Sequence, residues 1–145
     1  MKITLVALGI VFIIIFAPSV FGEERNIEIL AKKFSYSPNI IRVKRGDEVT
    51  FRLISEDVTH GLHVDGYQLS TKAQPGQDGS ISFVADRTGR FTFRCSVTCG
   101  EFHPFMVGYL IVGPNTRFYI YAIIASAVGL GSIFTALFVK KRKAG

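Results

Sequence analysis

The two cysteines of this chain lie four residues apart and are followed closely by a histidine and a methionine. The four residues are Cys95, Cys99, His103 and Met106, and they lie within twelve consecutive positions. Two thiols, an imidazole and a thioether form a soft ligand set of sulfur and nitrogen. Such a set suits copper far better than magnesium or calcium, which prefer oxygen. The stretch therefore predicts a copper site; the alternative is a disulfide, or two buried thiols beside a core methionine.

The presence of a second cysteine helps to distinguish a disulfide, a mononuclear copper site and a binuclear copper site. A disulfide across so short a loop stabilises a chain least by the loop-entropy argument, and it would leave His103 and Met106 without a role. A mononuclear electron-transfer copper uses two histidines, one cysteine and a weak axial methionine, so one thiol would be surplus. Two thiolates can instead bridge two copper ions, each of which then needs a terminal imidazole. Beyond His103, the chain offers only His60 and His63 for this purpose.

The elements that must hold these residues are short strands with turn punctuation. Between residues 23 and 117 the apolar residues alternate with polar ones, as in Val49, Phe51 and Leu53, which is the period of a half-buried strand. Six to eight such strands predict an all-β fold, a β-sandwich or small barrel with Greek-key connections. The expected strands are 26–34, 39–43, 48–53, 58–64, 80–84, 90–95 and 106–112.

Strand parity indicates where the cysteines lie. Phe91, Phe93 and Cys95 share one face of a strand, so this strand delivers Cys95 to the end of the core. The chain then leaves the strand, with Gly100 free to turn, and enters the next strand at Met106. The ligand residues therefore belong to a loop presented by a rigid scaffold.

The pattern Cys95-x-x-x-Cys99-x-x-x-His103-x-x-Met106, with His60 upstream, resembles the binuclear CuA site of cytochrome c oxidase subunit II. It is similar also to the cupredoxin domain of nitrous oxide reductase, and the resemblance covers about residues 40–113. The resemblance implies a cupredoxin fold in which the two cysteines bridge two copper ions. His60 and His103 would be the terminal ligands, Met106 a weak ligand to one copper, and the Val97 carbonyl a weak ligand to the other.

Four further residues are expected around the site. Asp57 is a candidate partner for the second ring nitrogen of a ligand histidine, and the alternative is a solvated carboxylate. His63 is expected to point away from the face that carries His60. Phe102 and Phe105 beside His103 would form an apolar docking patch, unless they belong to the core.

The predicted site indicates electron transfer. Its coordination positions are filled by protein, which leaves no open position for a substrate, so no catalysis is expected of this chain alone. The resemblance implies a redox subunit that relays electrons from a cytochrome c-like donor to the other subunits of a membrane oxidase. Two alternatives remain: a copper-delivery protein for oxidase assembly, and a β domain with a structural disulfide and no metal.

Both ends of the chain are apolar. Residues 1–22 read as a signal peptide cleaved near Gly22, or as an uncleaved membrane anchor. Residues 117–139 predict a transmembrane helix, because 118–139 carry no charge, and 140–145 form a basic tail. By the positive-inside rule this tail is cytoplasmic. The copper domain, 23–116, is then expected on the periplasmic or other extracytoplasmic side of the cell membrane.

The positive charge of the chain lies mostly in this tail. The formal net charge is +6, and Lys140, Lys141, Arg142 and Lys143 supply four positive charges. Residues 23–117 hold twelve Lys and Arg against eleven Asp and Glu, so the domain is nearly neutral. The composition therefore argues against a nucleic-acid partner.

Overall fold

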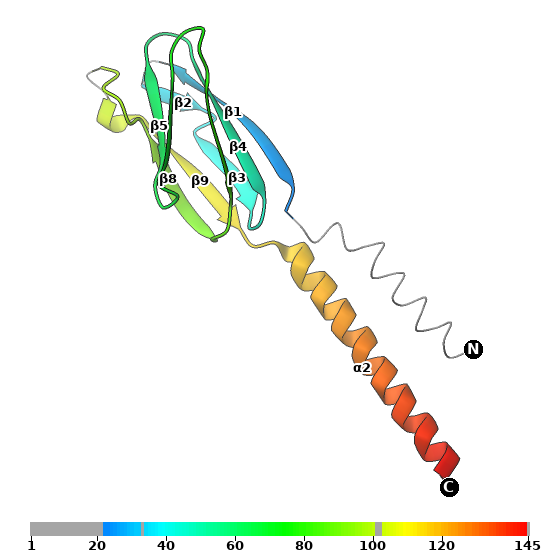
Figure 1. The fold of residues 1–145 in the computed structure, drawn as a ribbon. Helices are drawn as coiled ribbons and strands as arrows, with labels where there is room; N and C mark the ends of the chain where they lie inside the picture. The colour runs from blue at the N-terminus through cyan, green and yellow to red at the C-terminus, as the bar shows by residue number, and fades with distance from the viewer. Residues whose placement is uncertain (1–21, 33, 101–102, 145) are drawn as a thin grey trace. The chain divides into compact units, whose positions relative to one another are not determined.

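A computed structural model describes residues 22–32, 34–100 and 103–144, and residues 22–114 form a β domain of two packed sheets (Figure 1). The first sheet has the order β2-β1-β4-β7, with β1 at Glu24–Lys32, β2 at Ser35–Ser37, β4 at Glu48–Ser55 and β7 at Gly79–Val84. The second has the order β3-β9-β8-β5-β6, with β3 at Ile40–Lys44, β5 at His60–Val64, β6 at Leu69–Ala73, β8 at Gly89–Arg94 and β9 at Val107–Gly113.

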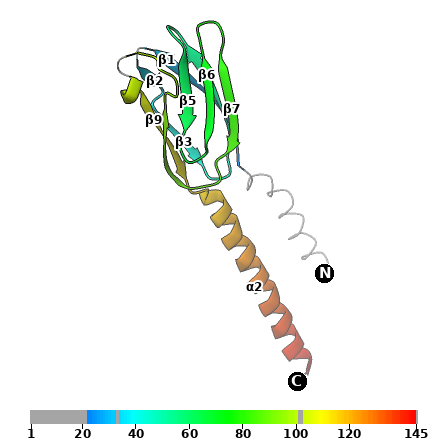
Figure 2. The same ribbon diagram turned by 60° about the vertical axis from the view of Figure 1, so that its left-hand side comes forward.

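The sheets are mixed, and the chain passes repeatedly from one to the other. β1 pairs parallel with β4 and β3 pairs parallel with β9, whereas the remaining pairs are antiparallel. Figure 2 shows β5 and β6 side by side at one edge of the second sheet. The predicted all-β sandwich is confirmed. The strand expected at 58–64 begins two residues later, at His60, and the one expected at 26–34 ends at Lys32.

The core lies between the two sheets and follows from the alternation of apolar residues. In β4, Val49, Phe51 and Leu53 are fully buried, and the residues between them face outward. Phe51 meets Phe93 of the other sheet with ring centroids 6.3 Å apart. Burying one such side chain stabilises the fold by roughly 1.5–3 kcal/mol. Phe93 lies two residues before Cys95, so the packing that fixes β8 also fixes the entry to the cysteine loop.

The helix α2 (Thr116–Ala144) forms a second unit of the chain. Its segment Thr116–Thr135 has a mean hydropathy of 1.7 and is long and apolar enough to cross a membrane. A C-terminal apolar helix of the predicted kind is therefore present. The predicted signal peptide or N-terminal anchor falls on residues 1–21, which lie outside the described part of the chain.

Candidate metal centre

The loop between β8 and β9 carries the cysteines, and both of its ends are held by the sheet. Cys95 follows β8 directly and Met106 precedes β9 directly, and the Cys95 N–H donates to the Met106 carbonyl at 3.2 Å. Within the loop, the short helix η2 (His103–Phe105) begins where the His103 N–H donates to the Gly100 carbonyl at 3.1 Å. Gly100 has φ +136°, a conformation that favours glycine. These backbone hydrogen bonds hold together the described parts of the loop, 95–100 and 103–106.

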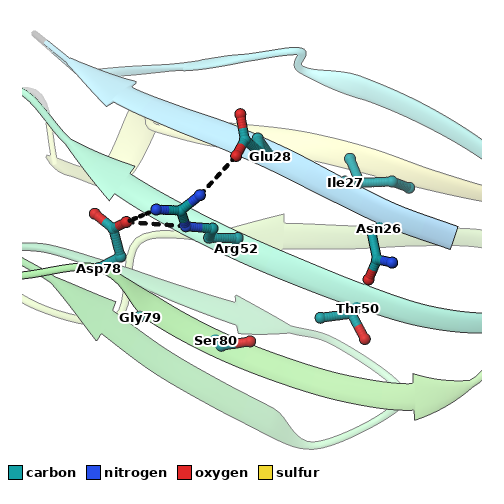
Figure 3. A pocket seen from close by; sticks show the side chains of 8 residues that line it. All are labelled: Asn26, Ile27, Glu28, Thr50, Arg52, Asp78, Gly79 and Ser80. Atoms are coloured by element: carbon teal, nitrogen blue, oxygen red, sulfur yellow. Dashed lines mark hydrogen bonds and ion pairs between the residues drawn. The ribbon is translucent and has the colours of Figure 1, made fainter.

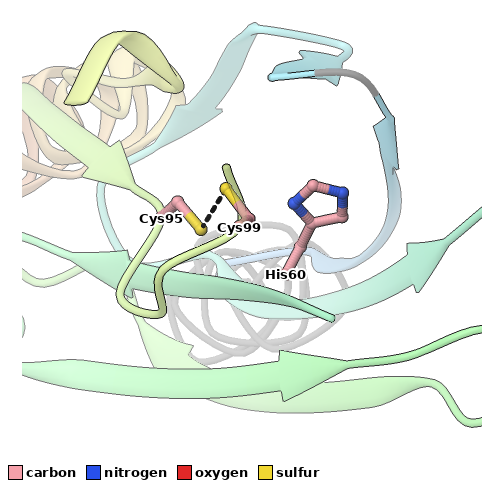
Figure 4. Close-up of side chains that lie close together, drawn as sticks. All are labelled: His60, Cys95 and Cys99. Carbon is pink, nitrogen blue, oxygen red and sulfur yellow. Dashed lines mark hydrogen bonds between the residues drawn. The ribbon is translucent and has the colours of Figure 1, made fainter. Parts of the chain in front are cut away.

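The two cysteine sulfurs face one another as free thiols. Cys95 Sγ lies 3.4 Å from Cys99 Sγ (Figure 4), whereas a disulfide bond is about 2.05 Å long. Cys95 is buried and Cys99 is partly buried. A nitrogen of His60 joins them, so that the three potential ligand atoms lie within 4.8 Å of one another. This spacing is what one small metal centre requires.

His60 presents one ring nitrogen to this cluster and uses the other to fix its orientation. The side chain is fully buried, and Nε2 lies 2.7 Å from Asp57 Oδ1. Nδ1 is also buried, and it has no hydrogen-bond partner among the described residues. A proton on Nε2 donated to the carboxylate leaves the Nδ1 lone pair free to bind a metal. A buried polar atom without a partner costs roughly 1–3 kcal/mol, and a metal ion at this position would remove that cost.

The remaining predicted ligands surround Cys99 and Cys95. His103 Nδ1 lies 3.6 Å from Cys99 Sγ, and Met106 Sδ lies 3.8 Å from the same sulfur. The Val97 carbonyl oxygen lies 3.1 Å from Cys95 Sγ. The structure therefore brings all six predicted ligand residues together. Their donor set of two thiols, two imidazoles, a thioether and a carbonyl fits copper.

The partly buried thiol of Cys99 lies beside the buried thiol of Cys95. Burial, followed by the hydrogen bond with Cys95, raises the pKa of Cys99 to about 11. At neutral pH this group is therefore a thiol in the metal-free protein, and a metal must displace its proton to bind. The Gly61 N–H donates to Cys95 Sγ at 3.4 Å, a contact that stabilises negative charge on that sulfur.

Two residues that the sequence analysis did not single out support this arrangement. A Cβ at Gly61 would overlap the Ser96 side chain and lie 2.8 Å from the Ser96 nitrogen, so only glycine lets β5 approach the cysteine loop this closely. The Tyr36 hydroxyl donates to the Gly61 carbonyl at 2.6 Å. Burial raises the pKa of Tyr36, and so does the negative charge that the two cysteines carry when they are ionised, so the tyrosine hydroxyl remains a neutral donor.

The other predicted residues lie outside the cluster. His63 Nδ1 lies 2.7 Å from Ser70 Oγ and its Nε2 lies 3.5 Å from Asp65 Oδ1, on the outer side of the second sheet. The Phe105 side chain is 75% exposed, so it is available for contact with a partner. Phe102 lies outside the described residues.

A hollow of about 350 Å³ lies elsewhere, on the outer side of β1, β4 and β7 (Figure 3). It is crossed by ion pairs from Arg52 to Glu28, at 2.8 Å, and to Asp78, at 2.6 Å. Its lining contains no sulfur and no imidazole. It therefore offers no soft ligands that would compete with the cysteine loop.

Comparison with known proteins connects this geometry to a family. Residues 5–112 match the family described as Cupredoxin-like domain. The chain is 35% identical over 90 residues to cytochrome c oxidase subunit 2 of Thermus thermophilus, covering 62% of this chain and 67% of that one. It spans 54% of a second subunit 2 sequence from the same species. It is 42% identical over 97 residues to nitrous-oxide reductase of Stutzerimonas stutzeri, covering 64% of this chain but 15% of that enzyme.

Among solved structures, the chain resembles the periplasmic domain of cytochrome oxidase subunit II from Bradyrhizobium japonicum, with a TM-score of 0.58. The sequence identity is 20%, and the match covers 71% of this chain and 94% of that domain. This likeness establishes the two-sheet fold by itself, independently of the cysteine pattern.

Proposed function

The chain belongs to the cupredoxin family, and from this premise we propose that it is a membrane-anchored electron-transfer protein with a binuclear copper centre. It carries a cupredoxin electron-transfer domain that resembles the copper domain of cytochrome c oxidase subunit II. The observation that carries the binuclear assignment is the pair of free thiols 3.4 Å apart, beside the buried and unpartnered Nδ1 of His60. A single copper would leave one of these thiols without a role.

Each residue of the cluster has a definite task in this proposal. Cys95 and Cys99 would hold both copper ions through their thiolates, and His60 and His103 would each hold one copper ion through Nδ1. Met106 and the Val97 carbonyl complete the set as weaker donors. When bound, the copper pair supplies exchange of a single electron. With these six donors bound, no coordination position would be left open for a substrate, so this set favours electron relay over catalysis.

The scaffold favours fast relay because it holds the ligands still. Cys95 and Met106 are joined by a backbone hydrogen bond, and both lie at the ends of paired strands. Asp57 holds the His60 ring, and the Met106 side chain is fully buried. Ligands fixed in this way rearrange little when the charge of the site changes, which lowers the barrier to electron exchange.

The proposed partners and location follow from the relatives and from α2. We propose a cytochrome c-like donor, and a membrane oxidase as acceptor, because two relatives are oxidase subunits 2. In this arrangement 117–139 span the membrane and the basic residues 140–145 lie in the cytoplasm. The copper domain, 23–116, then faces the extracytoplasmic side, where 1–22 would have delivered it as a signal peptide or would hold it as an anchor.

The test is the copper content and electron paramagnetic resonance of the full chain, reduced and then loaded with copper. The proposal expects two copper ions per chain and one unpaired electron delocalised over both. Cys99→Ser should bind one copper and give a mononuclear spectrum, because one bridging thiolate is gone. Ser96→Ala, in the same loop, serves as the matched control and should keep the pair.

Other outcomes would contradict the proposal. A delocalised two-copper spectrum in Cys99→Ser would show that the bridging assignment is wrong. A single, readily transferred Cu(I) in the unmodified chain would favour a copper-delivery protein. Absence of copper uptake after reduction would exclude both functions.

A further inference from the structure

The outer side of the second sheet concentrates positive charge. We use the name basic face for the outward positions of β3, β9, β8, β5 and β6. Five of these positions are Arg or Lys, and none is Asp or Glu. The five basic residues are Arg42, Lys44, Lys72, Arg90 and Arg94. Because the domain as a whole is nearly neutral, this face creates a local positive potential.

Strand register arranges these side chains around an apolar stripe on β9, which is formed by the outward Val107, Tyr109 and Ile111. Arg42 and Arg90 lie on either side of Ile111 in one cross-strand row. The guanidinium of Arg90 lies over the Tyr109 ring, 3.6 Å from its centroid. Val107, at the start of the stripe, is 36% exposed. Arg and Tyr are enriched at protein interfaces, where both combine a flat apolar surface with hydrogen-bonding atoms.

The charges of this face are mostly uncompensated. Among the described residues, Arg94 is the only one of the five that forms an ion pair, with Asp65 at 2.9 Å. The first sheet differs: its outward Arg52 is paired with two carboxylates, as Figure 3 shows. Uncompensated cations on one face attract an anionic partner and repel a cationic one.

The basic face reaches the copper ligands at one end. Arg94 directly precedes Cys95, and Val107 directly follows Met106; the two outward residues are cross-strand partners. Consecutive Cα atoms are about 3.8 Å apart, so a partner on this row lies one residue away from two ligands. Electron transfer weakens steeply with distance, and this end of the face is therefore suited to it.

We propose that the basic face is the docking surface for an electron donor whose own docking surface is acidic. This inference rests on the proposed electron-transfer function and adds the charge of the donor. A protein partner is favoured over a lipid surface, because the outward positions hold no Phe, Leu or Trp that would insert into a bilayer.

The test uses the full chain in nanodiscs of zwitterionic phosphatidylcholine and two c-type cytochromes, one acidic and one basic. Association rate constants and affinities are measured with and without copper, over a range of salt concentrations. The acidic cytochrome should bind more tightly, and binding should weaken as salt rises. Arg42→Gln/Arg90→Gln should slow association roughly tenfold at low salt. The control pair Lys32→Gln/Arg52→Gln removes the same charge from the first sheet. It should change the association rate constant less than about twofold.

Tighter binding of the basic cytochrome, or equal losses in the two variant pairs, would overturn the proposal. So would hydrogen-exchange protection of β9 that appears only in phosphatidylglycerol nanodiscs, because it would assign the face to lipid. The copper readout separates this proposal from the preceding one. Two copper ions without preference for the acidic cytochrome would reject the docking surface alone. One copper ion with that preference intact in the metal-free chain would reject the binuclear relay alone.

Discussion

At the scale of single residues, the orientation of His60 carries the argument for a metal. Its Nε2 is held at 2.7 Å by Asp57, and the buried Nδ1 is left for a ligand. We expect Asp57→Asn to lower copper affinity roughly 10-fold to 100-fold, because the amide neither fixes the tautomer nor raises the basicity of the ring as a carboxylate does. Competition with a copper chelator measures this. The matched control is Asp65→Asn, next to His63 on the outer side of the sheet, and it should leave the affinity unchanged.

Met106 supports a second prediction at this scale. Its side chain is fully buried, with Sδ 3.8 Å from Cys99 Sγ. Met106→Leu conserves volume, so the free energy of unfolding should fall by less than about 1.5 kcal/mol. The copper pair should persist with a raised reduction potential, because loss of the electron-donating sulfur disfavours the oxidised state. Voltammetry measures the potential, with Leu110→Met as the conservative control in β9. A potential equal to that of the unmodified chain would contradict a ligand role for the thioether.

At the scale of elements, strand alternation predicted much of what holds the site. The period of two along 90–95 predicted that Phe93 and Cys95 face inward, and the structure has both buried, Phe93 in β8 and Cys95 directly after it. The alternation did not predict β6, because its outward Ser70 and Lys72 make it a polar edge strand. It did not predict β2 either, because three residues are too few to show a period. Neither the Tyr36 hydrogen bond nor the close approach at Gly61 has a local signal, because both join segments far apart in the sequence.

One prediction at the scale of elements concerns the close approach of β5 to the cysteine loop. Gly61→Ala would push a methyl group into Ser96 and the loop backbone, with a cost of roughly 1–3 kcal/mol in the free energy of unfolding. Denaturant titration measures the loss, and copper affinity should fall with it because Cys95 is displaced. The control is Gly113→Ala, where a Cβ would make only an ordinary contact at 3.8 Å. Equal stability of the two variants would show that the loop adapts to the extra methyl group.

At the scale of the whole molecule, the chain divides into a β domain that carries the chemistry and a helix that carries the apolar surface. The units are Gly22–Pro114 and, among the described residues, the segment from Asn115 onward. Every buried core residue, from Ile29 to Val112, belongs to the first unit. Nearly all of the described side chains of the helix are exposed, and its segment Thr116–Thr135 is long and apolar enough to cross a membrane.

This division predicts that a fragment of residues 22–114 folds and binds copper by itself. No core residue of the domain comes from α2, so the fragment retains its hydrophobic stabilisation, the His60 pocket and the complete loop from Cys95 to Met106. We expect a soluble fragment that unfolds in one cooperative transition and takes up as much copper, with the same spectrum, as the full chain in nanodiscs. Calorimetry and electron paramagnetic resonance measure these properties. A fragment that aggregates, or that binds copper with a different spectrum, would show that the helix or the membrane shapes the site, because the ligands themselves are all retained.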